Sequence, residues 1–301
     1  MSEQTRTPPP PLGYGRSAAV TRLAHFGSLT YGRLTAPARV LPTFLICGGQ
    51  RCGTTSLYRA LAAHPAILKA VLHKGVHYFD TNYHRGPAWY RAHFPLRDTV
   101  GRVAARYGVP GQVFESSPYY LYHPHAPSRI AADLPGVKLV VLVRDPVERA
   151  YSQHAHEVAR GFEREPDVER ALAAEPSRLA GEVARMRVEP WYHSFAHQHL
   201  AYRERGEYVT FLRRLEQLVG RDRVHVVDAG DFFTDPEPAY DGVLRFLGLP
   251  NLGYPPFERH NARPRVSALP ARLRDELREH YRPYDEELTE WLGREPSWRR
   301  R

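Results

Sequence analysis

Residues 48–55, Gly-Gly-Gln-Arg-Cys-Gly-Thr-Thr, have the residue types and spacing of a loop that binds a phosphate-like anion. They follow Thr43–Cys47, an apolar run long enough for one buried strand of a parallel sheet, and Thr54 opens an amphipathic stretch. In such a strand–turn–helix unit, the free N–H groups of the first helical turn point at the anion, and the helix dipole favours its charge. We therefore predict an anion-binding loop here.

The loop differs from that of a nucleotide-hydrolysing enzyme at one position. Gly48 and Gly53 are five residues apart and Thr55 stands at the Ser/Thr position, as in G-x-x-x-x-G-K-[ST]. Thr54, however, stands where that motif has its lysine, and Arg51 is the only cation in the loop. The loop thus lacks the usual lysine for the β/γ-phosphates of ATP. A tight turn without a ligand is the alternative interpretation.

A second candidate anion site follows Lys138–Val143, the clearest strand of the sequence. Arg144 comes directly after this strand, and Pro146 is suited to the first turn of the next helix. Ser152 lies eight residues beyond Arg144 on that helix. One strand end and the next helix can therefore offer a guanidinium and a hydroxyl to one anion. The alternative is a surface arginine and an unrelated helix serine.

Composition narrows the class of ligand. The 301-residue chain has a formal net charge of +9 at pH 7, which favours anionic ligands. It contains no run of about 18 uncharged apolar residues, so no membrane span is predicted. Its N-terminus lacks the apolar core of a signal peptide, and its two cysteines suit neither a disulfide framework nor a zinc site. We expect a cytoplasmic location, and nucleic-acid binding has no support beyond net charge.

Strands alternate with helices along the rest of the chain. Further short apolar runs predict strands at Val113–Glu115 and Val224–Val227. Amphipathic patterns predict helices at Tyr208–Leu218 and Tyr240–Leu247, and two closing helices at about 269–292. This alternation indicates an α/β protein, a P-loop-like three-layer fold with a central parallel sheet flanked by helices.

The chain is expected to hold one principal domain. Residues 1–40 form an N-terminal segment that is predicted to be partly disordered, because its prolines and glycines bury nothing. Residues 41–298 form the single predicted domain. Within it, the charged stretch near 160–190 is interpreted as a variable helical insertion or lid.

Taken together, these segments resemble the sulfotransferases that use 3′-phosphoadenosine 5′-phosphosulfate (PAPS), closest to the glycan branch of heparan sulfate N- and 3-O-sulfotransferase domains. The resemblance runs from about Thr43 to Trp298. It rests on the order and spacing of Gly48–Thr55, Lys74-Gly-Val-His-Tyr-Phe79, Glu115-Ser-Ser-Pro118, Val143-Arg-Asp-Pro146 with Ser152, Asp231-Phe-Phe-Thr-Asp-Pro236 and Phe246-Leu-Gly-Leu249.

The resemblance implies how the donor is bound. PAPS is the expected co-substrate and 3′-phosphoadenosine 5′-phosphate (PAP) its product, with no metal required. Arg144 and Ser152 match the pair that binds the 3′-phosphate, and Arg263 with Arg265 resembles the basic loop that closes over the donor. The expected loop around the 5′-phosphosulfate comprises Gly49, Gln50, Arg51, Cys52, Gly53, Thr54, Thr55 and Ser56.

The acceptor side carries the main departure from the family. The glycan branch has a glutamate, thought to take the acceptor proton, where this chain has Gly75. His77 matches the motif histidine and is the best substitute, because an imidazole titrates near neutrality. Glu115 is the second candidate. Lys74 is expected to contact the transferred group or orient the acceptor, and Arg51, at the position of the family's loop lysine, to neutralise charge on the bridging oxygen. A packed histidine is the alternative for His77.

Three functions are therefore compared. The favoured one is a sulfotransferase that moves a sulfuryl group from PAPS to a hydroxyl or amine of a small-molecule or saccharide acceptor. The others are a P-loop kinase-like phosphotransferase and a non-catalytic nucleotide-binding protein. Saccharides, secondary metabolites and lipid headgroups would each fit the predicted acceptor cleft, and the sequence has no signal for the oligomeric state. This cleft is expected to be lined by Tyr78, Trp89, Tyr119 and Tyr120.

Overall fold

A five-stranded parallel sheet organises the protein in the computed structural model, which describes residues 27–258 and 269–300. The strand order is β2-β3-β1-β4-β5. The chain thus builds β2 and β3 on one side of β1, and β4 and β5 on the other. The strands are β1 (Phe44–Gly48), β2 (Ile67–Lys69), β3 (Gln112–Ser116), β4 (Lys138–Val143) and β5 (Val224–Asp228).

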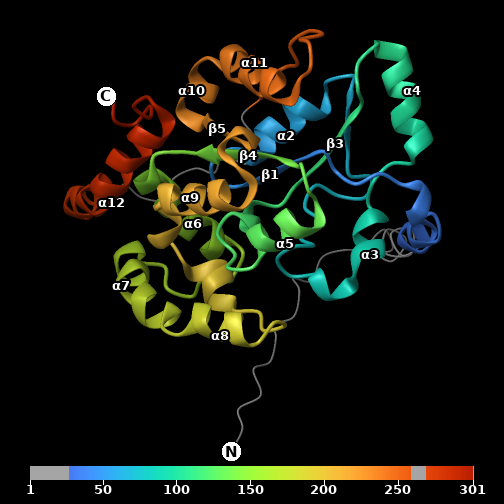
Figure 1. The fold of residues 1–301 in the computed structure, drawn as a ribbon. Coiled ribbons are helices and arrows are strands. Elements are labelled where there is room, and N and C mark those ends of the chain that lie inside the picture. The colour runs from blue at the N-terminus through green and yellow to red at the C-terminus, as the bar shows by residue number, and fades with distance from the viewer. Residues whose placement is uncertain (1–26, 259–268, 301) are drawn as a thin grey trace, which may run out of the picture.

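Helices cover both faces of this sheet, which gives the predicted three layers. In Figure 1, α2, α10 and α11 lie above the sheet, and α5, α6 and α9 lie below it. The helices are α2 (Thr54–Ala62), α3 (Pro87–Arg91), α4 (Arg97–Tyr107), α5 (Ala126–Asp133), α6 (Pro146–Ala159), α7 (Val168–Leu179), α8 (Glu182–Val188), α9 (Tyr208–Val219), α10 (Ala229–Thr234), α11 (Pro236–Leu247) and α12 (Ala271–Leu292). Residues 27–34 are also helical. The α/β three-layer prediction is confirmed.

Strands β1 and β4 are almost entirely apolar because helices bury them on both sides. All five residues of β1 are buried, as are the last five of β4. Phe44 of β1 stacks on Phe114 of β3 with ring centroids 4.8 Å apart. This core fixes the ends of β1, β3 and β4 relative to one another.

The charged stretch near 160–190 is helical and is fastened to α6. Helices α7 and α8 occupy most of it (Figure 1). Ala171 and Leu172 are buried in a cluster with Val147 and Ala150 of α6. The buried Glu175 carboxylate accepts hydrogen bonds from the backbone amides at 203 and 204, at 2.7 and 3.1 Å. These contacts tie α7 to the chain that leads into α9.

The structure differs locally from what the sequence predicts. The two closing helices are one continuous helix, α12, which runs through Pro283. A proline inside a helix costs about 3 kcal/mol, yet Leu277, Tyr281 and Leu288 bury one face on both sides of it. Strand β2 was not predicted, because its three residues include the exposed Lys69. No helix within the described ranges is both long and apolar enough to cross a bilayer.

The sheet topology determines where a ligand can bind. Because the strands are parallel, the carboxyl ends of β1, β3 and β4 lie at one edge of the sheet, and the strand order reverses at β1 between the other two. The segments that leave this edge are 49–53, 117–118 and 144–145. These segments contain six of the residues that the sequence predicts for the site, which are Gly49, Gln50, Arg51, Cys52, Gly53 and Arg144.

Candidate active site

The loop between β1 and α2 is shaped by two residues with left-handed backbone conformations. Arg51 has φ of 67° and Gly53 has φ of 90°. The Gly49 amide donates to the Leu142 carbonyl of β4 at 2.7 Å, which anchors the start of the loop. Gly53 occupies the N-cap of α2 and has no side chain to bond the first-turn amides. The N-terminus of α2 thus lacks a side-chain cap at the place where the spacing predicts a bound anion.

A lysine from another segment reaches the start of α2. Lys74 Nζ donates to Thr55 Oγ1 at 2.9 Å and to Thr54 Oγ1 at 3.3 Å. Burial, with a smaller contribution from the nearby Arg59, lowers the pKa of Lys74 to about 8. Lys74 thus places a cation beside Thr54, which stands where the motif of nucleotide-hydrolysing enzymes has its lysine. This cation comes from a different part of the chain.

The structure brings the two predicted phosphate-binding clusters into contact. Arg51 Nε donates to Ser152 Oγ on α6 at 3.1 Å, and Arg144 Nη1 donates to the Arg51 carbonyl at 3.2 Å. The Asp145 side chain caps α6 by accepting from the amides of Val147 and Glu148. Two guanidinium groups and one hydroxyl thus gather where the loop meets α6, an arrangement suited to an anion with more than one phosphate.

The remaining loop side chains hold the loop in place. Gln50 Nε2 donates to Glu157 Oε1 at 3.1 Å, and Gln50 Oε1 accepts from Arg205. Cys52 Sγ lies 3.4 Å from the Tyr208 hydroxyl, which itself donates to the Arg144 carbonyl at 2.9 Å. Burial raises the pKa of the Cys52 thiol. Cys52 therefore links the loop to its surroundings as a neutral thiol.

Ser56 and Gly53, which are also predicted for donor binding, both lie close to packed side chains. Ser56 is buried in the first turns of α2. A Cβ at Gly53 would lie 2.8 Å from the Phe233 ring, so a side chain there would meet α10 as well as the strain of its φ. Arg263 and Arg265 lie outside the described residues.

His77 lies beside Lys74 and is paired with a buried carboxylate. The Nδ1 atom of His77 is 2.7 Å from Asp80 Oδ2. The His77 side chain is 37% exposed, whereas the Asp80 side chain is fully buried. Burial on its own lowers the pKa of His77, but the charge and hydrogen bond of Asp80, together with Glu115, outweigh it and raise the pKa. With Nδ1 engaged, Nε2 is the ring nitrogen left for a reacting proton.

Glu115 lies behind His77 in the protein interior. Its Oε1 accepts from the Tyr120 hydroxyl and its Oε2 from Ser117 Oγ, both at 2.7 Å. Ser117 Oγ in turn accepts from the His77 amide at 3.0 Å. Burial raises the pKa of Glu115, against hydrogen bonds from Ser117 and Tyr120 that lower it. The carboxylate is fully buried.

The four aromatic residues expected to line the acceptor cleft are core residues instead. Tyr78 stacks on Tyr90 with centroids 4.5 Å apart, and its ring lies 6.3 Å from that of Trp89. Aromatic side chains bury large areas and pack on one another, so this cluster forms the support of the site rather than its wall. The four, all buried, are Tyr78, Trp89, Tyr119 and Tyr120.

Three residues of the candidate site, Asp80, Arg205 and Glu157, are not among those that the sequence analysis predicts. Asp80 stands three residues after His77, and this spacing was a signal that could have identified it. Arg205 and Glu157 are far from the loop in sequence, and nothing in their local pattern connects them with Gln50. Their contacts depend on tertiary packing alone.

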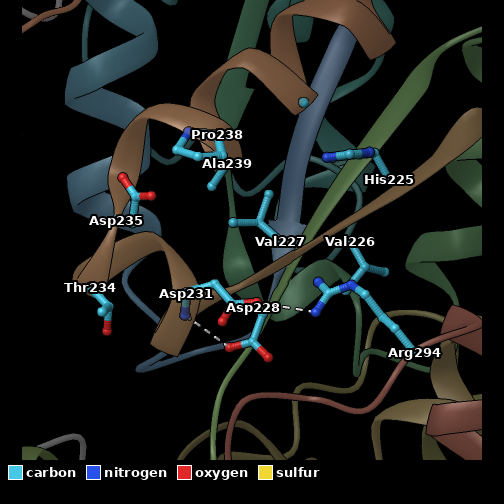
Figure 2. A pocket seen from close by; sticks show the side chains of 11 residues that line it. His225, Val226, Val227, Asp228, Asp231, Thr234, Asp235, Pro238, Ala239 and Arg294 are labelled. Carbon is cyan, nitrogen blue, oxygen red and sulfur yellow. Dashed lines mark hydrogen bonds and ion pairs between the residues drawn. The ribbon is translucent and has the colours of Figure 1, made fainter.

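A cavity of about 450 Å³ lies elsewhere, beside the edge strand β5. Figure 2 shows Asp228, Asp231 and Arg294 around it. Arg294 Nη1 lies 3.1 Å from Asp231 Oδ2, and Asp228 Oδ2 accepts from the Ser297 amide at 2.7 Å. These contacts fasten the C-terminal segment to β5 and α10, and none of the donor-binding candidates that the structure describes lines the cavity. Among the described residues, no three His, Cys, Asp or Glu side chains are grouped to hold a metal ion.

Comparison with known proteins gives consistent matches. A family model described as the sulfotransferase domain matches residues 41–259. The human bifunctional heparan sulfate N-deacetylase/N-sulfotransferase 3 is 33% identical over 228 residues, covering 71% of this chain and 23% of the relative. The human heparan sulfate glucosamine 3-O-sulfotransferase 5 is 29% identical over 221 residues, covering 72% of this chain and 56% of the relative. The aligned region thus spans between about a quarter and about half of these relatives.

A solved structure also matches most of the chain. The crystal structure of a sulfotransferase from Alicyclobacillus acidocaldarius superposes with a TM-score of 0.63 and 26% sequence identity. The match covers 87% of this chain and all of that one. The three-layer fold and the order of its elements are therefore shared along nearly the whole of that protein.

Proposed function

The chain belongs to the sulfotransferase domain family, and on that premise we propose that it transfers a sulfuryl group from PAPS to a hydroxyl or amine, releasing PAP. The observation that carries this proposal is the contact of Arg51 with Ser152 and of Arg144 with the Arg51 carbonyl, beside the uncapped N-terminus of α2. PAPS has one anionic group on each side of its ribose, and these residues form two adjoining cationic positions.

The donor residues divide into two groups under this proposal. The amides at the start of α2, with Thr54 and Thr55, would hold the 5′-phosphosulfate. Arg144 and Ser152 would hold the 3′-phosphate, which distinguishes PAPS from ATP. Arg51 lies between the two and would neutralise charge on the bridging oxygen as the sulfuryl group leaves. The proposed contribution of Arg263 and Arg265 falls on residues outside those described.

The acceptor would react by in-line attack on sulfur, with His77 as the base. His77 Nε2 would take the acceptor proton while Asp80 holds Nδ1–H. Lys74, bonded to the hydroxyls of α2, would stabilise negative charge on the sulfuryl oxygens. Glu115 is fully buried and bonded to Ser117, so we assign it to positioning the His77 backbone. Positioning and electrostatic stabilisation would then account for most of the rate.

The acceptor is proposed to be a saccharide or a small molecule. Both relatives named above modify heparan sulfate, which favours a saccharide. The lysine of the family's Glu-Lys-Ser-Pro motif is Ser116 here, however, and Ser116 is buried. One cation that could grip an acidic glycan is therefore missing, which favours a less charged acceptor.

The donor assignment is tested by calorimetric binding of PAP and of ATP, without and with Mg²⁺. We expect a clear preference for PAP, and we expect Arg144→Ala to weaken PAP binding at least ~10-fold, or about 1.4 kcal/mol. Arg213→Ala is the matched control, because Arg213 forms an exposed ion pair with Glu287. Mg²⁺-dependent preference for ATP would contradict the proposal and favour the kinase-like alternative.

We also propose that the protein acts in the cytoplasm. Its two cysteines, Cys47 and Cys52, are buried free thiols, which fit a reducing compartment. Burial raises the pKa of Cys47 to about 12, so this thiol is unreactive at neutral pH. Fractionation of expressing cells should place the protein with cytosolic markers, and recovery with membranes or outside the cell would contradict this location.

A further inference from the structure

The ring of His77 occupies the space that a side chain at residue 75 would need. A Cβ built on Gly75 would lie 3.0 Å from Nε2 and 3.1 Å from Cδ2 of His77. It would also lie 3.3 Å from the Ser116 carbonyl oxygen. These separations are shorter than ordinary van der Waals contact, so residue 75 can carry a side chain only if the imidazole moves.

Hydrogen bonds of its backbone and of its ring hold His77 in this place. His77 has φ of 53°, a left-handed conformation that is uncommon for a residue other than glycine. The backbone amide of His77 donates to Ser117 Oγ at 3.0 Å. The His77 carbonyl accepts from the backbone amide and from the side-chain amide of Asn82, each at 2.9 Å. Its Nδ1 is bonded to the buried Asp80. Such over-determined, strained positions are concentrated at functional sites.

We propose that Gly75 is a positioning residue for proton transfer, because its missing side chain leaves the space that the Nε2 edge of the His77 ring occupies. The inference rests on the proposed sulfotransferase function and deepens it. It explains why residue 75 is a glycine where the family motif has a glutamate. The His77 ring occupies the space that a side chain at this position would need.

Under this proposal, sulfuryl transfer takes place with the His77 ring in the position beside Gly75. The acceptor oxygen or nitrogen forms a bond to sulfur as its proton moves to the lone pair of His77 Nε2. The bond between sulfur and the bridging oxygen breaks, and its electron pair stays on the 5′-phosphate of PAP. His77 ends as an imidazolium whose Nδ1–H faces Asp80, where the carboxylate stabilises the new charge.

The test compares Gly75→Ala with the wild type, and both again in a His77→Ala background. The assay follows PAP released from PAPS with two probes, de-N-sulfated heparan sulfate fragments and 4-nitrophenol. We expect Gly75→Ala to lower kcat at least ~10-fold, within the range that a positioned base contributes, and to leave the affinity for PAP unchanged. In the His77→Ala background it should cause no further loss, because it acts through His77.

Gly101→Ala is the control for the general effect of replacing a glycine by alanine. Gly101 lies in α4, and a Cβ there would meet nothing within 4 Å. Gly101→Ala should therefore keep full activity and should not lower stability. An equal loss from Gly75→Ala in both backgrounds, or no loss at all, would overturn the proposal.

A second readout needs no turnover, so it separates this proposal from the sulfotransferase assignment. Nitrogen-15 NMR of the imidazoles, with His77 identified by its disappearance in His77→Gln, reports tautomer and pKa. The wild type should show Nδ1–H bonded to Asp80, and Gly75→Ala should lose that signal and lower the pKa of His77. An unchanged His77 spectrum in Gly75→Ala would overturn the role of Gly75, whereas absent PAP binding in the wild type would overturn only the donor assignment.

Discussion

At the scale of single residues, the surroundings of Lys74 and His77 displace their pKa values toward each other. Burial lowers the pKa of Lys74 to about 8. Asp80 raises the pKa of His77 despite the opposing effect of burial. One segment of four residues thus holds the proposed base and the proposed cation, whose working forms coexist only within a limited pH range.

The pH profile of kcat/KM should therefore be bell-shaped. Activity should rise as the pH increases through the raised pKa of His77, because the neutral imidazole is the proposed base. It should fall as the pH passes about 8, because Lys74 loses its proton. Lys74→Arg should move the alkaline limb to higher pH, since a guanidinium keeps its charge. A profile that is flat through pH 8, or the same alkaline limb in Lys74→Arg, would contradict these roles.

Asp80→Asn tests the partner of the base. Asparagine can still accept from His77 Nδ1, but it removes the negative charge that raises the pKa of His77. We expect the acidic limb to move to lower pH and kcat to fall ~10- to 100-fold, because the imidazolium loses its stabilising carboxylate. Asp98→Asn, at an exposed position in the first turn of α4, is the matched control. An acidic limb that stays in place would separate Asp80 from the reacting group.

At the scale of elements, a buried network joins the donor loop to the chain that follows α8. Arg205 donates to Gln50 of the loop and to the carbonyls of His197 and Gln198, the latter two at 2.6 and 2.7 Å. The fully buried Glu157 of α6 accepts from Gln50 and pairs with His199 at 3.2 Å. The region after α6 therefore takes part in holding the donor loop.

Replacing the buried guanidinium should weaken donor binding from a distance. Arg205→Met keeps the volume but leaves Gln50 and two carbonyls without their donor, at about 1–3 kcal/mol for each unsatisfied group. We expect lower thermal stability and a PAP dissociation constant raised ~10-fold, measured by denaturation and calorimetry. Arg213→Met, on the exposed face of α9, should change neither. Lower stability with unchanged PAP affinity would show that the network does not act on the loop.

The elements that the sequence predicted share one property, which is strong local patterning. Strands β1 and β4 are continuous apolar runs, and α9 has a clear amphipathic face, so each was located to within about a residue. Strand β2 is short, and α12 continues through Pro283 because its buried face outweighs the proline. Both differences arise where tertiary packing overrides a local signal.

The same distinction applies to the candidate site. Arg51, Arg144 and Ser152 could be named from spacing after two strands, and the structure places them in contact. Asp80, Glu157 and Arg205 could not be assigned, because their partners depend on how distant segments pack. The aromatic residues expected at the acceptor cleft illustrate the limit of composition, since aromatic side chains serve a core as readily as a binding surface.

At the scale of the whole molecule, the sheet topology, the positive charge and the family match support one function. The strand order reverses at β1, and the loops from β1, β3 and β4 meet at that edge. The formal net charge of +9 favours the approach of an anionic donor. The family model covers residues 41–259, which contain every described residue of the candidate site.

The most direct test of this function follows the label from radiolabelled PAPS into an acceptor. The wild type and His77→Ala are compared at equal concentration, with de-N-sulfated heparan sulfate fragments and 4-nitrophenol as acceptors. We predict that label on the acceptor and free PAP accumulate in equal amounts, and that His77→Ala lowers the rate ~10²- to 10⁴-fold while binding PAP normally. Tight PAP binding by the wild type with no label on either acceptor would contradict sulfuryl transfer to these acceptors and favour a non-catalytic nucleotide-binding protein.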